Sequence, residues 1–132
     1  MTAKLYANFK LEKSFKRRFL NALRSGKYKQ TRDELFNQSF GGYCCLGVMC
    51  SLRGIKNREL EGVCFPQDIA SFDTAFNIDP TTHDFFHGIY SDESAWKVPY
   101  RGRMRPLNEL NDLEELTFKQ IANIIDRSVQ TY

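Results

Sequence analysis

Apolar residues recur every three to four positions in the first part of the chain, which is the spacing of one helix face. Phe15, Phe19 and Leu23 fall on this face, and Lys and Arg fill much of the opposite one. Gly26 follows as a residue that ends a helix without steric cost. The pattern predicts an amphipathic helix over residues 11–25.

A second amphipathic helix is predicted near the other end of the chain. Thr117 as N-cap and Gln120 at the third helical position form a capping-box pattern. One apolar stripe follows at helical spacing and consists of Phe118, Ile121, Ala122, Ile125 and Val129. We expect this stripe to face the core.

Residues 41–50, GGYCCLGVMC, concentrate glycine and cysteine in an apolar run. Two adjacent glycines allow a backbone turn that other residues resist. The apolar positions after them fit one broad face, so we predict a buried helix over residues 45–52 in preference to a buried strand. Gly47 weakens such a helix by about 1 kcal/mol unless another backbone segment must approach it.

The rest of the chain carries shorter patterns. They predict extended segments at 28–30 and 63–65, a strand at 35–36 and a turn over 37–42. A second turn is predicted at 79–82, before a short helix over 83–90. An edge strand over 96–100 and a helix with Pro106 at its first position, which ends at about residue 111, follow. Together the elements predict the α+β class, as a single compact domain over residues 1–132. In this arrangement the N- and C-terminal helices cover a small, mostly antiparallel sheet.

Composition excludes several classes of protein. The 132 residues are 42% hydrophobic, enough for one core, and no stretch approaches the roughly 20 apolar residues of a membrane span. The basic N-terminal region is followed by no apolar block or cleavage site, so we expect no secretory signal. Adjacent Cys44 and Cys45 are a poor basis for disulfides, and we therefore expect reduced cysteines and a cytoplasmic protein.

Charge is distributed unevenly along the chain. Residues 1–32 hold ten Lys or Arg and one acid, a net charge of about +9, whereas residues 33–132 carry about −6. Residues 68–95 contain six acids and no Lys or Arg. Such a field steers charged partners, and the alternative is that the basic helix simply lies near the acidic segment of the same fold.

Four blocks of the sequence resemble, in order, a group of small proteins encoded by bacteriophages and by bacterial genomes that carry phage-like elements. The blocks are FLNALRSGKYKQ at 19–30, YCCLGVMC at 43–50, LND at 110–112 and LTFKQIA at 116–122. In that group a helix ending LRSGxYxQ leads to CCLGVxC, and the chain closes with LND and an FxxIAxxI helix. The resemblance implies a phage accessory context and carries over no catalytic residue.

The adjacent thiols suit two interpretations. A catalytic cysteine needs a lowered pKa, as at a helix N-terminus beside a histidine. The residues of such a site are Cys44 or Cys45 as nucleophile, His83 or His87 as base, and Asn111 or Asp112 to orient the base. In the other interpretation, which we favour, Cys44, Cys45 and Cys50 are small buried residues of the core.

A metal site is not predicted from the same residue types. The available ligands are Cys44, Cys45, Cys50, Cys64, His83 and His87. They include no CxxC pair, and adjacent cysteines rarely reach one tetrahedral ion together. No cofactor is predicted either.

Arginines alternate within the segment WKVPYRGRMR at 96–105, and aromatic residues lie beside them. An extended segment projects Arg101, Arg103 and Arg105 to one side, where guanidinium groups suit phosphates, while Trp96 and Tyr100 suit a base. The residues Lys27, Tyr28 and Gln30 are candidates to line the same ligand-binding pocket. The alternative is a solvated loop that faces the acidic segment.

The polar face of the first helix is a fourth candidate site. Its cations Lys13, Lys16, Arg17, Arg18 and Arg24 can meet nucleic-acid phosphates, or they form a solvated face. No helix-turn-helix or zinc-finger pattern follows the helix.

The leading functional hypothesis is a phage-type accessory protein that is a binder and not an enzyme. It interferes with a host system, such as a defence system, in the bacterial cytoplasm, by binding a nucleotide-type small molecule or a host protein. The alternatives are a cysteine-dependent hydrolase or transferase and a nucleic-acid-binding protein that uses the basic first helix.

Overall fold

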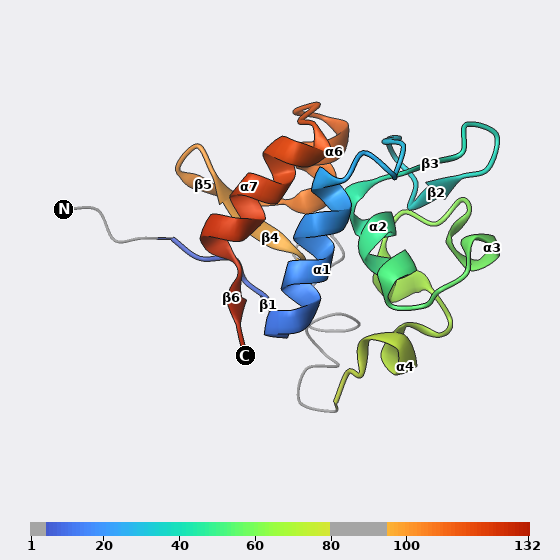
Figure 1. Ribbon diagram of the computed structural model, residues 1–132, viewed down its shortest axis with the longest axis horizontal. Coiled ribbons are helices and arrows are strands. Elements are labelled where there is room, and N and C mark those ends of the chain that lie inside the picture. Colours follow the sequence, from blue (N-terminus) through green and yellow to red (C-terminus); the bar gives the residue numbers. More distant parts are fainter. Residues whose placement is uncertain (1–4, 80–94) are drawn as a thin grey trace.

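The computed structural model describes residues 5–79 and 95–132. Two helices, α1 (Lys13–Arg24) and α7 (Phe118–Ser128), lie side by side and run in opposite directions (Figure 1). Each buries the predicted stripe, with Phe19 of α1 and Ile121 and Ile125 of α7 fully enclosed. The two helices that periodicity predicted are therefore confirmed and form the central pair of the fold.

The ends of both helices follow their predicted signals. Gly26 has a φ of +78° just beyond α1, where a residue without a Cβ meets no steric penalty. At the start of α7, the Gln120 backbone N–H donates to Thr117 Oγ1 over 3.2 Å, and the Thr117 N–H donates to Gln120 Oε1 over 2.8 Å. The capping box is therefore confirmed.

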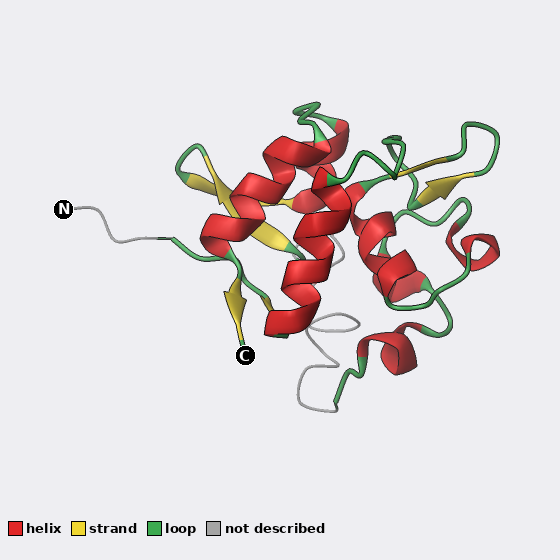
Figure 2. Cartoon of the chain, viewed as in Figure 1, coloured by secondary structure: helices red, strands yellow, loops and turns green. Residues whose placement is uncertain are grey.

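Six short strands of the described residues pair into three separate two-stranded sheets (Figure 2). Their members are β1 (Lys10–Leu11) with β6 (Gln130–Thr131), β2 (Phe36–Asn37) with β3 (Gly42–Tyr43), and β4 (Lys97–Tyr100) with β5 (Arg103–Pro106). The first pair is parallel and the other two are antiparallel. The α+β class with small, mostly antiparallel sheets is confirmed, and α7 lies against β4.

The remaining described helices are short. They are α2 (Cys45–Leu52), α3 (Asn57–Leu60), the 3-10 helix η1 (Pro66–Asp68), α4 (Phe72–Phe76) and α6 (Leu107–Asp112). One of them, α2, packs against α1 and against three of the others, α3, η1 and α6. The bounds predicted for α2 are confirmed. Pro106 is the N-cap of α6 and not its first helical residue, because its ψ of 143° is extended. The helix predicted over 83–90, and most of the turn before it, lie outside the described residues.

A close backbone crossing explains the glycine inside α2. A Cβ built on Gly47 would lie 1.8 Å from the carbonyl oxygen of Leu35 and 2.7 Å from its carbonyl carbon. Leu35 precedes β2 and is fully buried, so the crossing holds the β2–β3 hairpin against α2. The glycine therefore costs helix propensity and permits a contact that no other residue allows.

We predict that Gly47→Ala destabilises the chain by more than about 3 kcal/mol, because backbone on both sides must move to admit one methyl group. Urea unfolding measures the loss. Ser51→Ala, in the same helix and half-buried, is the matched control and should change stability by less than about 0.5 kcal/mol. Equal stability of the two variants would disprove the crossing.

Candidate functional site

Asn111 of α6 connects the sequence blocks that are far apart along the chain. Its side chain is fully buried. Its Oδ1 accepts hydrogen bonds from Gln30 Nε2 over 2.9 Å and from the Cys45 N–H over 3.3 Å. Its Nδ2 donates to the Thr31 carbonyl oxygen and to Asp112 Oδ1, each over 2.7 Å. All four hydrogen-bonding positions of the amide are used, so we call these contacts the Asn111 network.

The Asn111 network places the adjacent thiols inside the protein. Cys44 is the N-cap of α2, and Cys45 is its first residue, with 2% and 0% of their surface exposed. The Cys45 Sγ donates to the Leu107 carbonyl oxygen over 3.6 Å. Burial raises the pKa of Cys44 to about 12, and burial together with the nearby Cys44 thiol and Asp112 carboxylate raises the pKa of Cys45 well above its ordinary value.

These positions do not suit a catalytic thiol. A thiolate nucleophile needs a lowered pKa and access for a substrate, and Cys44 and Cys45 have neither. The Asn111 amide, a candidate to orient a histidine, is already saturated by its own network. The predicted bases His83 and His87 lie outside the described residues.

The residues predicted to bind a nucleotide have different structural roles. Trp96 is 3% exposed, and its Nε1 donates to Gln67 Oε1 over 3.1 Å. Phe9 packs edge-on against the Trp96 indole, with ring centroids 5.3 Å apart. Gln30 Nε2 is held by Asn111 and by the Leu116 carbonyl oxygen over 2.8 Å. Trp96 is therefore part of the core, and the half-buried Gln30 has its side-chain amide committed to groups of the protein itself.

The three alternating arginines do not share one side, because the extended segment is interrupted. Arg101 and Gly102 form the turn between β4 and β5, and only Arg103 and Arg105 stand on the strand. Arg105 is half-buried and bonded to Glu109 over 2.9 Å.

Of the other predicted ligand-binding residues, Tyr100 is half-buried at the same hairpin and Lys27 is exposed after α1. Tyr28 is half-buried and packs edge-on against Tyr43, with ring centroids 5.3 Å apart.

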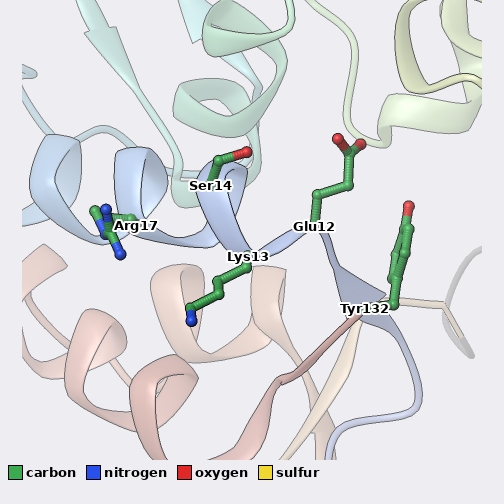
Figure 3. Close-up of a pocket in the computed structure, with 5 residues that line it drawn as sticks. All are labelled: Glu12, Lys13, Ser14, Arg17 and Tyr132. Atoms are coloured by element: carbon green, nitrogen blue, oxygen red, sulfur yellow. The ribbon is translucent and has the colours of Figure 1, made fainter.

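A basic groove runs between α1 and α7. Its volume is about 330 Å³, and it is lined by Lys13, Lys16, Arg17, Leu20, Asn21, Arg24, Asp126 and Thr131. A second hollow of about 490 Å³ continues past the start of α1 and is lined by Glu12, Lys13, Ser14, Arg17 and Tyr132. Figure 3 shows these five side chains spread around an open hollow, with Lys13 and Arg17 turned away from Glu12 and Tyr132. These side chains therefore line an open, shallow surface and do not enclose a cavity.

Two cations of the basic groove form hydrogen bonds with other groups of the protein itself. Lys16 Nζ donates to the carbonyl oxygens of Asp126 and Val129, over 3.1 and 2.7 Å, at the C-terminal end of α7, where a positive charge is favoured. Arg24 bonds to Asn123 Oδ1 and Asp126 Oδ2 over 2.9 and 3.3 Å. These bonds hold α1 to α7.

Two other cations of the groove, Lys13 and Arg17, are exposed and make no hydrogen bond or ion pair with residues 5–79 or 95–132. They are four positions apart and therefore share one helix face. The sequence indicated the cations of α1, but it gave no signal for the acidic and polar residues that α7 and β6 add to the groove.

One protein-family model, described as a domain of unknown function (DUF8296), matches residues 11–129. The chain belongs to this family, and the matched span includes the Asn111 network and α1 and α7, which form the groove. No curated protein and no solved structure matches the chain.

Residues 5–79 and 95–132 contain neither a membrane-spanning helix nor a cluster of metal-binding side chains. In these ranges, no helix combines the length and the apolar composition that crossing a membrane requires. The same ranges contain no group of three or more His, Cys, Asp or Glu placed to bind a metal ion.

The raised pKa of Cys44 predicts how stability depends on pH. Between the ordinary value of 9.0 and about 12 the unfolded chain loses the Cys44 proton and the folded chain keeps it. Stability therefore falls as pH rises through this window, by about 1.4 kcal/mol per pH unit from this thiol. Urea unfolding of wild type and Cys44→Ala across the window measures the difference. Identical slopes would contradict the buried, protonated thiol.

Proposed function

We propose that this chain is a phage-type accessory protein that acts as a non-enzymatic binder, interferes with a host system, and uses the basic groove to bind an acidic surface of a host protein. The observation that carries the proposal is the exposed, uncommitted pair Lys13 and Arg17 beside a shallow groove. The phage context rests on the resemblance of the sequence blocks.

The shape of the groove supports a protein partner over a small molecule. Small-molecule sites are concave and enclose most of their ligand, whereas this hollow is open and its side chains diverge (Figure 3). The adjoining basic groove between α1 and α7 also includes the Leu20 side chain and the Asp126 carboxylate beside the cations. A mixed lining of this kind suits the apolar and charged groups of a protein surface.

The interior supports binding over thiol catalysis. Cys44 and Cys45 are enclosed and protonated at neutral pH, and the Cys45 N–H bonds to the saturated Asn111 amide. The basic groove, in contrast, places charges where an anionic partner is steered toward them, which accelerates association.

Nucleic acid is the second candidate partner, because four cations of α1 line one groove at helical spacing. Phosphate contacts make the affinity fall steeply as the salt concentration rises. The logarithm of the binding constant falls linearly with the logarithm of the salt concentration, and the slope reflects the number of phosphates neutralised. Asp126 in the same groove repels phosphates and acidic side chains alike, so it is the apolar Leu20 in the lining that favours the protein partner.

The test compares two double charge reversals of equal size. Lys13→Glu/Arg17→Glu changes the groove, and Lys56→Glu/Arg58→Glu changes exposed residues at α3. Tagged chains are recovered from nuclease-treated bacterial lysate, and each captured protein is then purified and titrated against all three chains. We expect the groove variant to weaken the complex by about tenfold or more and the α3 variant to leave it near wild type.

Three results would reject the proposal. They are equal weakening by both variants, no purified partner that distinguishes them, and a complex that forms only when nucleic acid is present. The last result would instead establish the second candidate.

A further inference from the structure

The turn between β4 and β5 holds an arginine in a backbone conformation that arginine disfavours. Arg101 has a φ of +51° and Gly102 one of +79°, and Tyr100 pairs with Arg103 across them. A two-residue hairpin turn with both φ values positive is a type I′ turn, for which Asn-Gly is the favoured sequence. A residue with a longer side chain is strained at the first position.

Nothing in the described fold compensates for this strain. Arg101 and Arg103 are both exposed, and neither forms an ion pair with residues 5–79 or 95–132. The Arg101 guanidinium carbon lies 5.3 Å from the centre of the Tyr100 ring, which is a weak contact at an exposed site.

Arg105, two residues further along β5, shows the opposite arrangement. It is half-buried, and two carboxylates hold it, Glu109 at 2.9 Å and Glu114 at 3.2 Å. The hairpin therefore uses one arginine for its own packing and leaves the two at its tip exposed to solvent.

We propose that the β4–β5 turn is a phosphate-binding site in which Arg101 and Arg103 hold one phosphate group and Tyr100 lies beside them. Two guanidinium groups present paired N–H donors that match phosphate oxygens. The turn requires a positive φ at position 101, and Asn would adopt it with less strain and without the charge. A strained residue that the turn itself does not call for is a feature of functional positions. The site is separate from the basic groove and does not depend on the proposed function.

The experiment uses the full chain and four probes: inorganic phosphate, ADP, a single-stranded DNA of about 12 nucleotides, and the duplex of the same length. Wild type should bind at least one probe. Arg101→Asn should weaken that binding by about tenfold or more, because charge-assisted hydrogen bonds are lost. Its melting temperature should equal or exceed that of wild type, because Asn-Gly fits the turn.

Arg58→Asn is the control, since it removes the same charge from an exposed residue of α3. Arg103→Gln is a second site variant that keeps the turn unchanged and should also weaken binding. If phosphate or ADP binds and DNA does not, the phosphate group comes from a small free ligand. If DNA binds, the phosphate group belongs to a nucleic-acid backbone. Either result supports the proposed phosphate-binding site.

Any of three results would overturn the proposal: no probe binds wild type, both site variants bind as wild type does, or Arg58→Asn weakens binding as much as they do. A positive result here with a negative result for the groove separates the two proposals, because their variants share no residue.

Discussion

The buried side-chain amide of Asn111 is the interaction on which the arrangement of this protein depends. It joins the loop after α1, the start of α2 and the end of α6 through four hydrogen bonds. A buried amide that lost these partners would leave unsatisfied groups, each of which costs about 1–3 kcal/mol. Because the network closes around the first turn of α2, Cys44 and Cys45 are interior residues. The two adjacent thiols therefore do not reach the surface.

The first helix combines two roles that its sequence pattern does not separate. Lys16 and Arg24 neutralise the C-terminal end of α7 and hold the central helix pair together. Lys13 and Arg17 have the same charge and belong to the same helix, yet they face solvent. One basic helix thus supplies both the cations that hold α7 and two cations that are exposed, and only contacts with α7 distinguish the two pairs.

Local features of the sequence predicted the elements well, and tertiary features could not be predicted. The Thr117–Gln120 capping box and the stripe with Phe19 are local, so their patterns sufficed, and Gly47 signalled a backbone crossing without naming Leu35 as its partner. The Asn111–Gln30 bond spans 81 positions, and no periodicity points to it.

Alternation predicted that Arg101 stands on a strand, whereas Arg101-Gly102 is a turn. Gly102 was the available signal.

Hydrogen exchange at the Cys45 amide tests the central claim most directly. This N–H lies in the first turn of α2 and its bond is to Asn111 Oδ1, so it can exchange only when the network opens. The account predicts that its free energy of opening equals the free energy of global unfolding measured with denaturant. Exchange through a local opening of much lower free energy would contradict it, because α2 would then open where the thiols lie.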